Sequence, residues 1–226
     1  MKLKEKISSI SFVVMICLAF VATMEVPVGH AQELSLNAQL LVAARNGDEV
    51  AATRALEAGA KPNSRNRSGD SALILFAKSG NLKMVRLLID KGADVNQPDI
   101  VRVTPLIAAS YGGQAEVVRL LLDQGADTEK ADQMFKTAVL YAATEGHSEV
   151  ISLLLDRGVK VNARYRNDLT ALMWAAGSGQ TSAVRILLDR GADPGLVDNR
   201  GKTALVIARE ANRSEVVELL QRSELH

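Results

Sequence analysis

Glycines recur in this chain at a fixed interval of 33 residues. The interval separates the consecutive members of two sets, and the two sets stay in phase along most of the chain. A long and constant period is typical of repeat proteins, in which each unit packs only on its neighbours, and not of a single globular core. The length of the chain therefore indicates a number of units rather than a number of domains. The sets are Gly47, Gly80, Gly113, Gly146 and Gly179, and Gly59, Gly92, Gly125, Gly158 and Gly191.

Each unit carries the start and stop signals of two short helices. In a central unit, Thr104 can cap a first helix, and Pro105 fits its first turn because the N–H that proline lacks has no partner there. The pair Gly112 and Gly113 ends this helix, and a second helix with an apolar face follows. Gly125 comes after its last apolar residue, where a positive φ ends a helix at little cost only for glycine. The pattern predicts two helices and then a hairpin-like loop.

The motif that begins the first helix is also repeated. It reads Ser-Ala-Leu, Thr-Pro-Leu, Thr-Ala-Val or Thr-Ala-Leu, and it starts at Ser71, Thr104, Thr137, Thr170 and Thr203. With the 33-residue period, this motif resembles the start of an ankyrin repeat. The resemblance implies an all-α ankyrin-repeat solenoid of about six helix-turn-helix units joined by β-hairpin-like loops. The expected units span residues 37–68, 69–101, 102–134, 135–167, 168–200 and 201–222.

The N-terminus has the pattern of an export signal. Lys2, Lys4 and Lys6 precede a long uncharged stretch, and small residues stand at Gly29 and Ala31. We expect a signal peptide over residues 1–31, with cleavage after Ala31, and therefore a periplasmic or secreted protein with its repeat domain over 32–226. The alternative is a membrane-anchored protein with an uncleaved leader, because the uncharged stretch is nearly long enough to span a bilayer.

The charge balance argues against nucleic acid as the partner. The leader carries three of the 27 basic and two of the 26 acidic residues, so the rest of the chain is formally neutral. Charges of both signs are mixed along every unit, which predicts no extended electropositive surface. The single cysteine, Cys17, lies in the leader and leaves the repeats without a thiol.

No recognisable catalytic, cofactor-binding or metal-binding set is present in the sequence. The histidines are His30, His147 and His226, and the first would be lost with the leader. His147 follows a mid-unit glycine, where the family pattern has Gly-His, so the resemblance implies a structural role. No Ser-His-acid or Cys-His arrangement and no glycine-rich phosphate loop occurs. The sequence predicts a protein without enzymatic activity and without a cofactor.

The loop tips carry side chains that are unusual for solvent-facing turns. In ankyrin-like proteins the tips and the inner helices form the binding surface, and loops vary where scaffolds do not. Apolar and aromatic side chains beside arginine have the composition of a protein-binding hot spot. The alternative is that the tips pack on one another along the array, which applies above all to the apolar ones. The candidate partner-binding residues are Tyr111, Ile100, Val101, Arg102, Met134, Phe135, Tyr165, Arg166 and Arg200.

Three large side chains also share one position on the inner helices: Leu75, Tyr141 and Trp174. Large side chains at helical spacing are usually packing residues, so we predict packing and not ligand contact at this position.

The sequence as a whole favours a monomeric, non-catalytic protein-protein interaction module. The role we expect is an exported scaffold or protective partner of an envelope or periplasmic protein. A second hypothesis is an immunity-like inhibitor of a toxin or enzyme. A third, from another class, is a small-ligand-binding protein or an enzyme, which would require a deep polar pocket that a shallow curved stack does not provide.

Overall fold

The computed structural model describes residues 34–223, which fold into paired α-helices. The predicted signal peptide lies outside the described residues. The helices are α2 (Leu36–Asn46), α3 (Glu49–Glu57), α4 (Ala72–Ser79), α5 (Leu82–Asp90), α6 (Pro105–Tyr111), α7 (Ala115–Asp123), α8 (Ala138–Glu145), α9 (Ser148–Asp156), α10 (Ala171–Ser178), α11 (Thr181–Asp189), α12 (Ala204–Glu210) and α13 (Ser214–Ser223), with one 3₁₀ turn, η1 (Arg166–Asp168).

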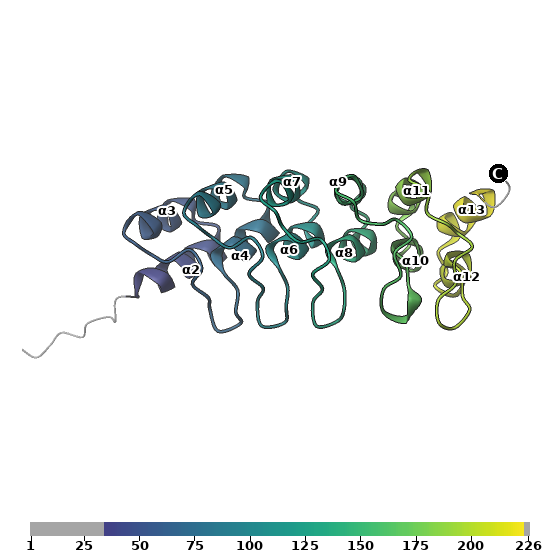
Figure 1. The fold of residues 1–226 in the computed structure, drawn as a ribbon, viewed down its shortest axis with the longest axis horizontal. Coiled ribbons are helices and arrows are strands. Elements are labelled where there is room, and N and C mark those ends of the chain that lie inside the picture. The colour runs from purple at the N-terminus through teal and green to yellow at the C-terminus, as the bar shows by residue number, and fades with distance from the viewer. Residues whose placement is uncertain (1–33, 224–226) are drawn as a thin grey trace, which may run out of the picture. The chain divides into compact units, whose positions relative to one another are not determined.

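The compact part of the chain that begins at Ser35 contains all the repeats, and its helices form two rows (Figure 1). The even-numbered helices α2 to α12 make the inner row, and the odd-numbered helices α3 to α13 make the outer row. The loops that lead into α4, α6, α8, α10 and α12 all project to the same side. Two of them contain an isolated antiparallel bridge, Arg65 with Ser71 and Ala131 with Thr137. The predicted all-α solenoid is therefore confirmed.

Capping residues set where the inner helices begin. The Thr104 hydroxyl accepts a hydrogen bond from the Ile107 N–H at 3.2 Å, and Pro105 occupies the first turn. Ser71, Thr170 and Thr203 cap α4, α10 and α12 in the same way. Each such cap stabilises its helix by about 1 kcal/mol.

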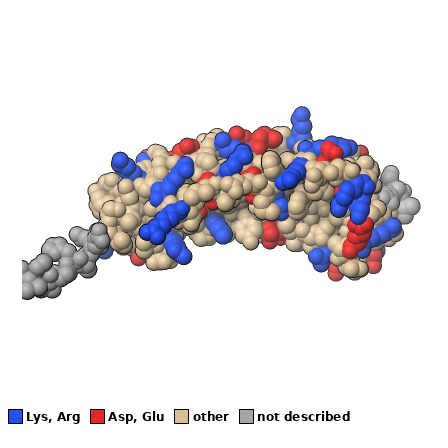
Figure 2. Space-filling view, turned by 90° about the horizontal axis from the view of Figure 1, so that it is seen from below, with Lys and Arg blue, Asp and Glu red and all other residues tan. Residues whose placement is uncertain are grey.

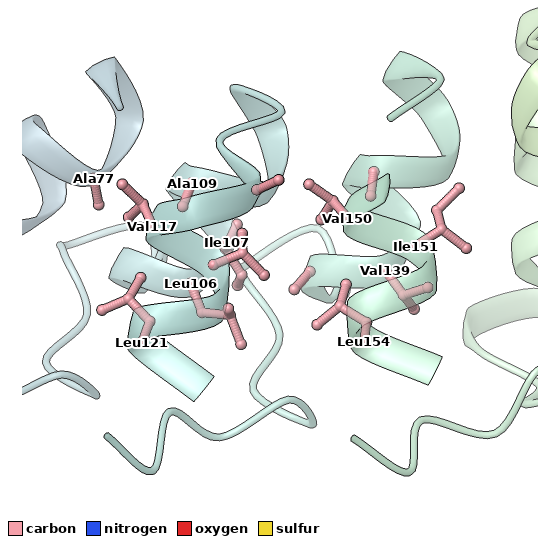
Figure 3. Packing of buried hydrophobic residues seen from close by; sticks show 14 of the residues in the cluster. Ala77, Leu106, Ile107, Ala109, Val117, Leu121, Val139, Val150, Ile151 and Leu154 are labelled. Carbon is pink, nitrogen blue, oxygen red and sulfur yellow. The ribbon is translucent and has the colours of Figure 1, made fainter. Parts of the chain in front are cut away.

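The continuous hydrophobic core includes a column of leucines that repeats with the sequence. On the outer helices the leucines that stand one period apart are fully removed from solvent. Figure 3 shows Leu121 with Leu106 in one repeat and Leu154 with Val139 in equivalent places in the next. No repeat buries both of its faces alone, so stability depends on contact between neighbours. The leucines of the column are Leu88, Leu121, Leu154, Leu187 and Leu220.

Hydrogen bonds between repeats hold the inner row in register. The Nε2 atom of His147 lies 3.0 Å from the carbonyl oxygen of Tyr111, in the preceding repeat. Gln114 and Gln180 make the equivalent bonds, to the carbonyls of Lys78 and Thr144, at 3.4 and 3.0 Å. His147 thus joins two repeats, as its place after Gly146 implied.

None of the helices between residues 34 and 223 combines the length and the apolarity that a membrane span requires.

Candidate functional site

The loop tips are held by side-chain acceptors at one repeated position. We name the tips 1 to 5 after residues 65–68, 99–102, 132–135, 165–168 and 198–201. In tip 3, Asp132 Oδ1 accepts hydrogen bonds from the backbone N–H groups of Met134 and Lys136 at 2.8 and 2.9 Å. Asn66 does the same in tip 1, and Asp99 and Asp198 hold tips 2 and 5.

Tip 4 is built differently because Tyr165 occupies the acceptor position. A tyrosine ring cannot accept the backbone N–H groups of its own loop there. The chain instead passes through η1, where Asn167 and Asp168 both take positive φ, 62° and 59°. Tyr165 itself is half-buried and packs against the core, so it is not an exposed contact of the kind we expected.

Most of the other predicted partner-binding side chains are exposed at the tips. Met134 is 66% exposed, Ile100 60% and Phe135 52%. Val101 and Tyr111 are also exposed, as are Arg102, Arg166 and Arg200. Backbone hydrogen bonds do join tips 1, 2 and 3, but the apolar side chains of tips 2 and 3 remain in solvent.

Two of these side chains stand on strained backbone. Phe135 and Arg102 have φ of 64° and 68°, a conformation that glycine adopts freely and other residues adopt at a cost. They occupy places where the family pattern has glycine. Strain of this kind is commonly found at functional positions, where the side chain itself is needed.

Aromatic rings and lysines contact one another along the row of inner helices, next to the tips. The rings of Tyr111 and Tyr141 meet edge to face with centroids 5.7 Å apart. The Lys136 Nζ atom lies 3.9 Å from the ring centroid of Trp174 and 5.2 Å from that of Tyr141. Lys78 lies over Tyr111 at 5.6 Å. We call these five residues the aromatic row. It offers both apolar area and cation–π contacts to a partner.

The aromatic row was only partly foreseen. We predicted packing for the position shared by Leu75, Tyr141 and Trp174, and these side chains do pack against the core, but each is only half-buried. The unused sequence signal was Lys136, which stands directly before the helix-starting Thr137 and therefore lies beside the rings of two successive inner helices.

Polar groups near the aromatic row are partly removed from water, which shifts their pKa values away from the ordinary ones. The Tyr141 hydroxyl donates to Asp132 Oδ2 at 2.6 Å, and burial together with this bond raises the pKa of Tyr141. Burial lowers the pKa of Lys136, and it raises the pKa of Asp99, which also has Asp70 and Asp132 nearby. Charged and polar contacts made by a partner here would be stronger than in open water.

A hollow of about 310 Å³ lies between tips 1 and 2 and the inner helices. Its floor includes Leu75 and Ile107, and its rim carries Asp70, Asp99 and Lys78. It has room for a side chain of a partner, and its groups do not form a nucleophile-base arrangement. No set of three or more His, Cys, Asp or Glu side chains that could hold a metal ion occurs among residues 34–223.

Some carboxylates of the tips are used inside the loops, while the tip arginines are exposed. Asp132 and Asp198, at the repeated acceptor position, are turned inward to hold their loops and are only 4% exposed. The arginines of the tips point outward, and Figure 2 shows Lys and Arg side chains along much of the tip side. Within the described residues, Arg200 alone among the exposed tip-region arginines has an ion pair, with Asp198 at 2.7 Å. These arginines are Arg65, Arg67, Arg102, Arg164, Arg166 and Arg200.

Four cations of the outer row are instead paired across repeats: Lys83 with Glu49, Arg119 with Glu149, Arg157 with Asp123 and Arg190 with Asp156. Exposed carboxylates, among them Asp168 of tip 4 and the nearby Glu129, also lie in the tip region, so it carries charges of both signs. A count of charges along each unit does not show which carboxylates the fold uses internally.

A comparison with models of protein families finds a match. The family model described as ankyrin repeats, in three copies, matches residues 40–132, 101–165 and 139–225. No curated protein matches the chain.

Proposed function

Because the chain belongs to the ankyrin-repeat family, we propose that it binds another protein outside the cytoplasm, through the tips and the aromatic row. Ankyrin repeats are in general non-catalytic modules for protein-protein interaction. The role that we propose is that of a scaffold or protective partner for an envelope or periplasmic protein. The location rests on the leader pattern of residues 1–31, with its three lysines, uncharged stretch and small residues before Gln32.

The observation that carries this proposal is the aromatic row beside the exposed apolar tips. Tyr, Trp and Arg are the residues most enriched in interface hot spots, and Met and Phe are also enriched in interfaces. Here Trp174 and Tyr141 are held in place by Lys136 and Asp132, so little side-chain entropy remains to be lost on binding. A rigid aromatic surface next to exposed Met134 is therefore well suited to contact a protein.

A capture experiment tests this function. The chain from Gln32 onward is immobilised, and an envelope or periplasmic extract of the source organism is passed over it. Replacing Tyr111 and Met134 by alanine is expected to reduce the retained partner about tenfold, because both exposed side chains would be buried in the interface. Quantitative mass spectrometry of the retained proteins measures the change.

The matched control replaces Val42 and Val50 by alanine. These two side chains are 47% and 62% exposed, close to the exposure of Tyr111 and Met134, but they lie in the first repeat, on α2 and α3. Equal retention by the parent and by the Tyr111/Met134 variant would contradict the proposed surface. If the captured protein is a toxin or an enzyme that loses activity when bound, the inhibitor hypothesis replaces the scaffold.

A further inference from the structure

Neighbouring tips are joined by two kinds of hydrogen bond, except at one place. The first kind is a backbone bond between tips: Ile100 N–H donates to the Ser68 carbonyl, Gln133 N–H to Val101 and Asn199 N–H to Asn167, at 3.3, 2.9 and 3.0 Å. These bonds join tips 1 to 2, 2 to 3 and 4 to 5. In the described structure no such bond joins tip 3 to tip 4.

The second kind is an asparagine that links successive loops. Asn63 Nδ2 donates to the Gly92 carbonyl at 3.0 Å, and its Oδ1 accepts from the Asp94 N–H at 2.8 Å. Asn96 and Asn162 make the same two bonds to the loops that follow them. Glu129 stands at this position between tips 3 and 4, and an ionised carboxylate cannot donate to a carbonyl.

Among the described loops, the junction between tips 3 and 4 is therefore the one that lacks both kinds of hydrogen bond, and we call it the open junction. The helices on either side of it remain in contact. It is crossed by the guanidinium of Arg166, which lies 4.8 Å from the centroid of the Phe135 ring. Two open hollows flank this contact. The larger, of about 520 Å³, is lined by residues that include Thr137, Arg164 and Arg166, and the smaller, of about 210 Å³, reaches Lys136 and Trp174 of the aromatic row.

Thr137 lines the larger hollow and carries a buried hydroxyl. Thr137 is 5% exposed, and its Oγ1 atom makes no hydrogen bond of normal geometry, although it interacts with the Tyr165 phenol. Unlike Thr104 and Thr170, the N-cap residue Thr137 makes no side-chain capping bond to its own helix. A buried hydroxyl without a regular partner is uncommon in folded proteins, and the Thr137 hydroxyl lies behind the surface of the hollow, next to the Tyr165 phenol.

The charge around the junction matches an anion. Arg164 and Arg166 line the larger hollow together with a single carboxylate, Glu129. Arg166 has no ion pair among the described residues, and Lys136 borders the smaller hollow. A guanidinium binds a carboxylate through two parallel hydrogen bonds, which few other acceptors match in geometry. The ring of Phe135 adds an apolar wall for a neighbouring side chain.

From these observations we infer that the junction between tips 3 and 4 binds an acidic segment of the partner protein. An Asp or Glu of that segment meets Arg166, and an adjacent apolar side chain covers Phe135. The inference rests on the proposed function and adds the chemistry of the partner. A nucleic acid favours an extended basic surface, whereas exposed carboxylates such as Glu129 and Asp168 lie among the arginines here, so the protein segment is the better match.

Peptide display provides the test. A library of random twelve-residue peptides displayed on phage is selected against the full chain, and the retained pool is sequenced. Enrichment of Asp or Glu next to apolar residues is expected. A synthetic peptide from the pool should bind about tenfold more weakly to Arg166→Gln, and equally well to Arg185→Gln, which removes the same charge from an exposed position on α11.

A second variant tests whether peptide binding depends on the open junction or only on the charge of Glu129. Glu129→Asn supplies the asparagine that joins the other loops, so it is expected to close the junction and to weaken peptide binding about tenfold. If charge alone governed binding, removing Glu129 would strengthen it, and that result would overturn the inference.

The remaining outcomes are also decisive. A pool without acidic enrichment, or no retained peptide, overturns the inference, whereas the proposed function is judged separately by the capture experiment. Binding of a twenty-nucleotide single-stranded DNA or of phosphatidylglycerol vesicles that depends on Arg166, without binding of the acidic peptide, would assign the site to other polyanions.

Discussion

Leu154→Ala is expected to lower the free energy of unfolding by about 2–5 kcal/mol. Leu154 is fully buried in the leucine column, on α9, and the shortened side chain would leave a cavity between α8 and α9. The repeat lies in the interior of the array, so a weakened unit also loses coupling to the repeats on both sides. Urea denaturation followed by circular dichroism measures the change.

Leu153→Ala is the control for that variant. Leu153 is the preceding residue on the same helix and is only half-buried, so the same change of chemistry removes less packing. It should destabilise the protein clearly less than Leu154→Ala does. An unfolding midpoint equal to that of the parent for Leu154→Ala would show that the assigned core is wrong.

Asp132→Ala is expected to cost about 2–4 kcal/mol, a large effect for a loop residue. The Asp132 carboxylate accepts three hydrogen bonds, from the N–H groups of Met134 and Lys136 and from the hydroxyl of Tyr141, and its removal leaves these donors without their partner. Tip 3 would lose its fixed conformation, and Tyr141 would lose its anchor in the aromatic row. Denaturation gives the free energy, and limited proteolysis locates the loosened loop.

Asp132→Asn should retain most of that stability. Asn66 holds tip 1 with the same Oδ1 acceptor, bonding the N–H groups of Ser68 and Asp70 at 2.8 and 2.9 Å. The asparagine therefore keeps the two backbone bonds and changes the bond to Tyr141. If Asp132→Ala unfolded at the same urea concentration as Asp132→Asn, the loop-holding role of the carboxylate would be refuted.

The fold was predictable from the sequence because its determinants are local. Thr104 and Pro105 begin a helix and Gly125 follows one by rules that act within a few residues, and the 33-residue period then repeats the result. The contacts between repeats follow the same period, as His147 shows by bonding one repeat back. Little long-range information is needed to recognise an array of this kind.

The site was less predictable because it depends on which charged side chains bond within the fold and which remain exposed to a partner. Charge counts gave equal numbers of each sign, yet Asp132 and Asp198 are turned inward while Arg102 and Arg166 are not. The placement of Lys136 between two rings requires the spacing of successive inner helices, which no single unit shows.

The sequence contains two departures from the repeat pattern that mark the open junction, and our sequence analysis did not use them. Glu129 replaces the asparagine of three other loops, and Tyr165 replaces the carboxylate or amide of four other tips. Their meaning is clear only from the hydrogen bonds that the other loops make. Departures from a repeat pattern are therefore informative once the physical role of each repeated position is known.

The binding surface is tested most directly by Phe135→Gly. Phe135 has a positive φ, which glycine adopts without strain, so the variant is expected to melt at or above the temperature of the parent. At the same time it loses an exposed ring at the centre of the proposed surface, and the retained partner should fall about tenfold. Partner retention and melting temperature measured on the same preparation separate recognition from folding. Lower retention with undiminished stability is the result that we predict, and undiminished retention would contradict the proposed surface.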